Sequence, residues 1–215
     1  MLRDYRPSGN AAAVETLHNP GANTFLGKLN MHEFAYGPTA TSSYYGMMKN
    51  PHDPSKMAGG SSGGSAIAVA TGMVAGALGT DTGGSVRIPA AFCGVYGLKP
   101  SYGSISRQGV LPLSWTLDHV GPIARDLDDI ELLWRILSHR MDHQMSPLTS
   151  PRVLWVTDTT LDGLDLVVQQ QMASARTRVG HLSAVDIVPG TLPRGEECRA
   201  SQQLILGAEA VNYHW

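Results

Sequence analysis

The amino-acid sequence predicts an α/β fold, and the last third of the chain gives the clearest evidence. There, short apolar runs alternate with longer amphipathic stretches in the order strand, helix, strand, helix. We expect these elements at residues 152–157, 164–179, 184–189 and 197–213. Because a helix is the usual crossover between two parallel strands, this order predicts parallel pairing. With 215 residues, 42% of them hydrophobic, the chain can bury a sizeable core.

The first part of the chain predicts short elements separated by loops. Asn10 stands where it can cap a helix over 10–18 that ends before Pro20. Residues 22–30 have the pattern of a strand that runs into a loop. Residues 36–58 are rich in Gly, Pro, Ser and Tyr, so we expect a long irregular loop, which in a compact domain tends to be functional.

The middle of the chain predicts two helices beside a glycine-rich turn. Residues 66–74 are small and apolar on every side, which is typical of a helix that is buried all round. The run 85–93 indicates a second helix, and 93–103 indicates a buried strand with a turn. Residues 107–125 have mostly the composition of a loop.

Asp126 is expected to cap the next helix, over 127–138, whose apolar residues recur at helical spacing. A connector then leads to the alternating last third of the chain. We therefore expect a single domain over 1–215, with a Ser- and Gly-rich catalytic part over 1–138 and a βαβα part over 151–215.

Composition and charge argue against several classes of function. The net charge is −2 and no run of Lys or Arg occurs, so nothing indicates binding to nucleic acid or to an anionic membrane. The most apolar stretch, 66–78, is interrupted and too short to span a bilayer. The two cysteines, Cys93 and Cys198, suit neither a zinc knuckle nor a disulfide framework, so we expect a cytoplasmic setting without metal or cofactor.

The segment AGGSSGGSA fits two known motifs only in part. Gly59 and Gly64 have the spacing of a P-loop, but Ser65 stands where that motif requires lysine. Gly-x-Ser-x-Gly occurs around Ser61 and again around Ser62. The nucleophile elbow with that pattern follows a strand directly, and the preceding residues NPHDPSKMA do not suit one.

Histidines leave two further interpretations open. A Ser-Asp-His hydrolase would combine one of these serines with Asp118 and His119, or with Asp142 and His143. His139 and His143 are also four residues apart, as two zinc ligands on one helix face would be. The position that a zincin fills with glutamate holds arginine here, which favours a solvated connector.

The turn GTDTGGS gives a stronger catalytic signal. Gly83 and Gly84 allow backbone conformations that are closed to other residues and let N–H groups point inward together. Ser85 follows at the start of a helix, where backbone N–H groups favour negative charge such as an oxyanion. Asp81 and Arg87 flank the turn and are placed to pair. Alone, these residues also fit a Gly-Gly turn that is capped by serine.

Together, the two glycine-rich motifs resemble the amidase signature family. The resemblance rests on GGSSGGSAIAVATGMVAGALGTDTGGSVRIPAAFCGVYGLKPSYG, with LGKLNMHEFAYG and NPHDP upstream and SRQGVLPLSWTLDHVGPIARDLDDIELL downstream. It is close over about residues 10–138 and looser as far as 215. It implies a mixed β-sheet covered by helices and hydrolysis of a carboxylic amide C–N bond.

The resemblance also implies roles for individual residues. Ser85 is the implied nucleophile, and Ser61, preceded by a cis peptide bond, is the implied proton relay. Ser62, Asp81 and Arg87 are expected to support this arrangement. The implied oxyanion donors are backbone N–H groups of the turn, at Thr82, Gly83, Gly84 and Ser85.

The chain departs from the family in its lysines. The implied base is a neutral lysine on a strand that reads Val-Lys-Asp. None of the four lysines matches that position: Lys28, Lys49, Lys56 and Lys99. We therefore expect the base before Met1 and a chain that is partial at both ends.

Two functions follow as hypotheses. The first is an amidase that acts on a small-molecule amide through a Ser85 acyl-enzyme, as a homo-oligomer or with amidotransferase-like partner subunits. The alternative is a catalytically inactive, truncated amidase-like chain or partner subunit that lacks the base.

Overall fold

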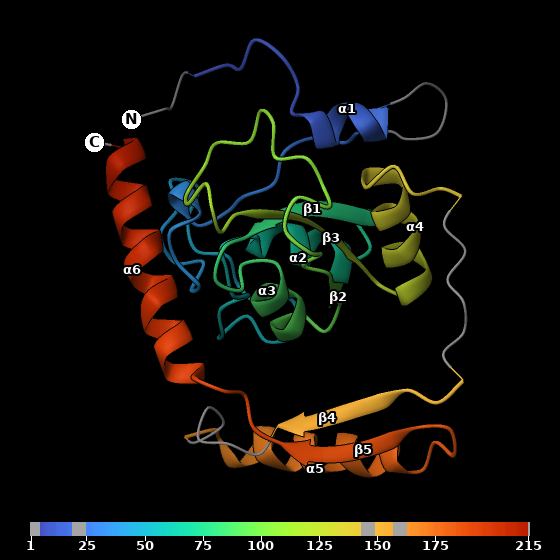
Figure 1. Ribbon diagram of the computed structural model, residues 1–215. Helices are drawn as coiled ribbons and strands as arrows, with labels where there is room; N and C mark the ends of the chain where they lie inside the picture. Colours follow the sequence, from blue (N-terminus) through green and yellow to red (C-terminus); the bar gives the residue numbers. More distant parts are fainter. Residues whose placement is uncertain (1–4, 19–24, 143–148, 157–162, 215) are drawn as a thin grey trace. The chain divides into compact units, whose positions relative to one another are not determined.

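The structure of the chain is a computed structural model that forms two compact units (Figure 1). It describes residues 5–18, 25–142, 149–156 and 163–214. The first unit comprises the described residues up to 142 together with 204–214, and the second comprises those from 149 to 203. Strands and helices occur in both units, which confirms the predicted α/β class.

The first unit is built around a three-stranded antiparallel sheet. The strand order is β1 (Gly76–Asp81), β3 (His119–Ala124) and β2 (Tyr96–Gly97), so β3 is central. The register of β1 and β3 runs from the pair Gly76 and Ala124 to the pair Asp81 and His119. In the last pair, Asp81 of the Thr-Asp-Thr-Gly-Gly-Ser turn segment faces His119, so the central strand is paired directly with the start of this turn.

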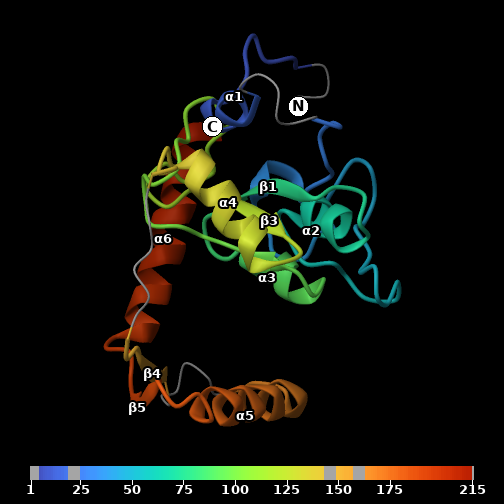
Figure 2. The same ribbon diagram turned by 90° about the vertical axis from the view of Figure 1, so that its right-hand side faces the viewer.

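Helices cover both faces of this sheet. Helices α2 (Gly63–Ala70) and α3 (Arg87–Phe92) pack on one face, and α4 (Leu127–Leu137) packs on the other with α1 (Ala12–His18). Figure 2 shows α2 and α4 on opposite sides of β1 and β3. A short 3-10 helix, Glu33–Ala35, precedes a long segment without further helices.

The core is correspondingly divided in two by the sheet. The cluster under α2 and α3 consists of Ala40, Met48, Ala58, Ala66, Val69, Val86, Cys93 and Ile123. The cluster under α4 and α1 consists of Ala13, Leu17, Ile105, Val120 and Leu137. Because Val120 and Ile123 belong to opposite clusters, β3 is buried on both faces, which is unusual for an antiparallel strand.

Two opposed glycines let neighbouring segments approach the sheet closely. Gly79 of β1 pairs with Gly121 of β3. A Cβ atom at Gly79 would lie 2.6 Å from Ser62 Oγ, and a Cβ at Gly121 would lie 2.1 Å from the Leu98 carbonyl oxygen. Both positions therefore require glycine for close packing rather than for backbone flexibility.

The second unit contains the predicted parallel strand pair. Strands β4 (Arg152–Val156) and β5 (Asp186–Gly190) pair in parallel, and α5 (Leu166–Gly180) connects them. Helix α6 (Gly195–His214) follows β5, and its last residues belong to the first unit. No described helix is long and apolar enough to cross a membrane.

The structure corrects several element predictions. Residues 25–30, the described part of the expected strand over 22–30, form no strand. The segment 107–125 is mostly loop as expected, but its residues 119–124 form the central strand β3, which was not predicted. The strand expected over 93–103 is reduced to two residues. Asn10 donates from its side chain to Glu15, and the helix begins only at Ala12.

Other element predictions are confirmed. The Asp126 side chain accepts a hydrogen bond from the Asp129 N–H at 2.8 Å and so caps α4 as expected. The segment 36–58 is irregular apart from an isolated bridge between Lys49 and Met57. Helix α2 is largely buried as predicted, although it begins three residues earlier, at Gly63.

Candidate active site

Ser61 occupies a buried position immediately before α2. A cis peptide bond joins Gly60 to Ser61, as the resemblance implies. The backbone is fixed on both sides, because Gly60 N donates to Pro38 O at 2.7 Å and His32 N donates to Ser61 O at 3.0 Å. The Ser61 side chain is completely buried, and its Oγ has no hydrogen-bond partner among the described residues. Such a buried hydroxyl needs an explanation, and proton transfer is one.

Ser62 connects this segment to the sheet and to the second motif. Its Oγ lies 3.2 Å from Thr80 N and 3.3 Å from Thr80 O, so it bonds the backbone of β1 as acceptor and donor. Its own N–H donates to the Ser85 carbonyl oxygen at 3.1 Å. The two serine motifs, separated in sequence by β1, are therefore joined by a direct backbone hydrogen bond.

Ser85 follows the glycine pair and precedes α3. It is buried, and its hydroxyl makes no hydrogen bond with the described residues. Gly84 has a φ of 130°, a backbone conformation that favours glycine, and a Cβ there would lie 2.7 Å from Ile88 Cδ1. The N–H groups of Gly83 and Ser85 also donate no hydrogen bond within the described part of the chain.

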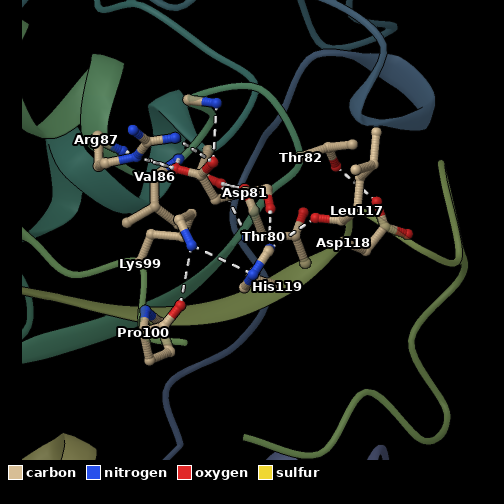
Figure 3. Close-up of polar contacts among 12 residues, drawn as sticks. Thr80, Asp81, Thr82, Val86, Arg87, Lys99, Pro100, Leu117, Asp118 and His119 are labelled. Carbon is tan, nitrogen blue, oxygen red and sulfur yellow. Dashed lines mark hydrogen bonds and ion pairs between the residues drawn. The ribbon is translucent and has the colours of Figure 1, made fainter. Parts of the chain in front are cut away.

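Asp81 holds the turn in shape from within. Its fully buried carboxylate accepts from the backbone N–H groups of Gly84 at 2.8 Å and Val86 at 3.1 Å. Arg87 completes the predicted ion pair, with its Nε at 3.0 Å and its Nη2 at 2.9 Å from the two carboxylate oxygens (Figure 3). The Gly84 N–H donates to Asp81 in this structure, so its expected role as an oxyanion donor stays a prediction.

The pKa values of this ion pair move apart. Burial alone would raise the pKa of Asp81, but the hydrogen bonds and charge of Arg87, with the N–H groups of Val86 and Gly84, lower it below its ordinary value. The hydrogen bond to Asp81 in turn raises the pKa of Arg87. Asp81 is therefore ionised at neutral pH, and its lowered pKa makes it a weaker base than an ordinary aspartate.

Thr82 and Asp118 form a second support of the turn. Thr82 Oγ1 donates to Asp118 Oδ1 at 2.6 Å, and the same carboxylate accepts from Leu113 N at 2.9 Å and Ser114 N at 3.1 Å. Asp118 is buried. Thr82 thus supports the turn through its side chain.

Glu209 of α6 bonds the loop 112–118, to which Leu113 and Ser114 belong. Its carboxylate accepts from Ser114 Oγ at 2.5 Å, from Thr116 Oγ1 at 2.7 Å and from Thr116 N at 3.1 Å. Burial alone would raise the pKa of Glu209, but these hydrogen bonds and the charge of Arg107 lower it. The sequence gives no local signal for Glu209, because nothing relates it to a loop more than 90 residues earlier.

The structure does not assemble the Ser-Asp-His alternative from Asp118 and His119. His119 Nδ1 lies 2.6 Å from Leu117 O and 3.2 Å from Asp81 O, so it must carry the ring proton. His119 Nε2 lies 3.2 Å from Lys99 Nζ, which donates to it (Figure 3). Neither nitrogen faces a serine. The other proposed histidine, His143, lies outside the described residues.

Comparisons with known proteins place the chain in a family. A family model described as Amidase matches residues 1–198. A glutamyl-tRNA(Gln) amidotransferase subunit from Anaeromyxobacter sp. is 40% identical over 225 residues, covering 98% of this chain and 45% of that protein. The corresponding protein from Archaeoglobus fulgidus is 49% identical over 138 residues, covering 64% of this chain and 30% of that protein.

Solved structures show the same likeness. A crystal structure described as an amidase superposes with a TM-score of 0.87 at 40% identity, covering 95% of this chain and 46% of that chain. The peptide amidase from Stenotrophomonas maltophilia gives 0.80 at 28% identity, with 98% and 47% covered. The chain spans less than half of the length of each of these relatives.

Proposed function

Because the chain belongs to the amidase family, we propose that it carries the nucleophile and the proton relay of an enzyme that hydrolyses a carboxylic amide. Ser85 is the proposed nucleophile and Ser61 the proposed relay. The observation that carries this proposal is the buried Ser61 hydroxyl, which lacks a hydrogen-bond partner among the described residues although the Ser62–Ser85 backbone bond fixes its segment against the turn.

The proposed reaction proceeds in two halves. Ser85 Oγ bonds to the amide carbonyl carbon while its proton moves to Ser61 Oγ, and Ser61 passes its own proton to a base. The proton returns through Ser61 to the amine nitrogen as the C–N bond breaks, which leaves an ester on Ser85. Water then hydrolyses this ester by the same relay.

The oxyanion proposal rests on the N–H groups of Gly83 and Ser85. Neither donates a hydrogen bond within the described residues, so both are available to a developing negative charge. That the backbone N–H of Thr82 also binds the oxyanion stays a prediction. Asp81 contributes indirectly, because it fixes the turn from which these groups project.

The positions of the four lysines in this chain favour a base that lies elsewhere in the whole protein. Lys28, Lys49 and Lys56 are exposed, and Lys99 Nζ bonds the Pro100 carbonyl oxygen and His119. All four are described, and none bonds Ser61 Oγ. This observation also favours the second candidate, in which this chain by itself is an inactive amidase-like unit or a partner subunit.

We further propose a small-molecule amide as the substrate and a cytoplasmic setting, the latter from the sparse cysteines. Relatives that are amidotransferase subunits by name favour partner subunits over a homo-oligomer.

The main experiment measures amide hydrolysis by the whole protein. Ser85→Ala is expected to abolish turnover, and Ser61→Ala to lower kcat by several orders of magnitude, as loss of a catalytic-triad member does. Ser201→Ala, at an exposed position of α6, is the matched control and should leave the rate unchanged. Full activity of Ser85→Ala would refute the assignment.

A labelling experiment separates the two candidates for this chain by itself. A fluorophosphonate probe reacts with activated serines. If this chain is inactive by itself, its labelling rate should not exceed the background labelling rate of its Ser85→Ala variant. Rapid labelling at Ser85 would show that the chain activates the serine without an additional lysine.

A further inference from the structure

The loop 112–118 connects α6 to the turn that carries Ser85. It has no helix or strand, and two of its polar anchors are buried carboxylates, Asp118 and Glu209. Ser114 belongs to both anchors, since its N–H donates to Asp118 and its hydroxyl donates to Glu209. A fully buried serine thus bridges two carboxylates.

The bonds on the Asp118 side reach the turn itself. Thr82 Oγ1 donates to Asp118 Oδ1 at 2.6 Å, a short hydrogen bond between a hydroxyl and a carboxylate oxygen. Thr82 is separated from Ser85 only by the two glycines. The side-chain bond therefore restrains a segment that its glycines leave intrinsically free.

The bonds on the Glu209 side fix the far end of the loop. Glu209 accepts from Ser114 and from both donors of Thr116, while the His214 ring lies 3.0 Å from the Pro112 carbonyl oxygen. Arg107 also donates to the Trp115 carbonyl oxygen. The loop is consequently held at both ends and at its middle.

We propose that Glu209 and Asp118 are positioning residues that act through the loop 112–118 to fix Thr82 and, with it, the nucleophile turn. The geometric part of this proposal concerns the ordering of the turn and does not depend on the reaction. Its consequence for catalysis rests on the proposed function. Neither carboxylate is proposed to touch the substrate.

Hydrogen exchange tests the geometric part in this chain without any activity assay. Glu209→Gln removes the charge that Ser114 and Thr116 bond. We expect hydrogen exchange to become about tenfold or more faster in peptides covering 112–118 and also in those covering 80–86. The reason is that losing a hydrogen bond to a charged group raises the population of the open state by about that factor. The control is Glu196→Gln on the same helix, where the side chain is exposed. Faster exchange in 112–118 with unchanged exchange in 80–86 would overturn the coupling.

A second pair of variants keeps the test decisive if Glu209→Gln fails to fold. Thr82→Val removes the hydroxyl that bonds Asp118 with little change in size, and Thr82→Ser retains it. Thr82→Val should quicken exchange in 80–86, and Thr82→Ser should restore the original rate. Equal rates in the two variants would show that the hydroxyl does not order the turn.

In the whole protein, the same pair tests the catalytic consequence. Thr82→Val should lower kcat about tenfold or more and leave KM nearly unchanged, because the turn is proposed to bind developing charge rather than the substrate. Thr82→Ser should recover kcat. A changed KM with constant kcat would overturn this role. Failure of the proposed function would instead appear as full activity of Ser85→Ala, whatever the exchange data show.

Discussion

Asp81 concentrates more of the turn's hydrogen bonds than any serine in the site does. Gly84, Val86 and Arg87 all donate to its carboxylate, which is completely buried. Arg87 is about half exposed, with 52% of its side chain accessible, so its charge remains partly solvated if the carboxylate is lost. The cost of removing Asp81 should therefore come mainly from the two buried N–H groups.

We expect Asp81→Ala to destabilise the first unit by several kcal/mol, because each buried N–H left without a partner costs about 1–3 kcal/mol. Asp81→Asn keeps one carbonyl acceptor and should cost less. Urea unfolding of each variant measures the difference. The matched control is Asp53→Ala, which removes an exposed pair with Lys56 and should have a much smaller effect. Similar losses for both alanine variants would contradict this account.

At the residue scale, contacts between residues close in sequence could be predicted, and contacts between distant residues could not. The Asp81–Arg87 pair, six residues apart, could be predicted because both ends of one turn lie in one motif. The hydrogen bond from the Gly84 N–H to Asp81 was not predicted, because the direction of this N–H depends on the exact path of the turn. Glu209 could not be found at all, since its partners lie in a loop that only the folded chain brings to α6.

At the scale of elements, the sheet of the first unit is the least predictable part. Strands β1 and β3 contain Gly79, Gly121 and Pro122, residues that disfavour strands. Burial on both faces of β3 overrides this local preference. In contrast, α4 has clear helical periodicity and an Asp126 cap, and the strand–helix–strand order of β4, α5 and β5 is visible in the sequence, so these elements were predicted correctly.

The opposed glycines give a prediction for this sheet. Gly79→Ala should destabilise the first unit by about 1–3 kcal/mol, the usual cost of overpacking, because its Cβ would lie 2.6 Å from Ser62 Oγ and 3.0 Å from Val86 Cγ2. Gly207→Ala on α6 is the control, with no described atom within 4 Å of the new Cβ, and should stabilise by up to about 1 kcal/mol. Thermal unfolding measures both changes. A neutral Gly79→Ala would show that Ser62 can move away freely.

At the scale of the whole molecule, the ionised carboxylates set how stability depends on pH. Asp81 and Glu209 both have a lowered pKa in the folded chain. The unfolded chain therefore binds protons at a higher pH than the folded one does. Their contribution is fully present above the unfolded pKa values of about 4 and is lost as the pH falls through the folded values.

We expect the free energy of unfolding to fall steeply as the pH drops below about 4. The double variant Asp81→Asn/Glu209→Gln should be less stable at pH 7 but show a shallower fall over the same interval. Denaturant unfolding at several pH values provides the slopes. An unchanged slope in the double variant would show that other carboxylates dominate the acid transition.

The two units should also differ in stability, because their cores differ. The first unit buries two hydrophobic clusters around its sheet, whereas no residue of 149–156 or 163–203 is buried. With so little apolar area removed from water, local opening of β4, β5 and α5 should require far less free energy than opening of β1 and β3.

We therefore expect amide hydrogens of the second unit to exchange first. Trypsin should correspondingly cut at Arg176 and Arg178 of α5 before it cuts at Arg125, whose guanidinium bonds the Val69 and Val74 carbonyl oxygens. Both measurements use the intact chain, so the first unit serves as the internal reference. Exchange and cleavage at equal rates in the two units would mean that they open as one cooperative body, and that their separate cores do not set the free energy of local opening.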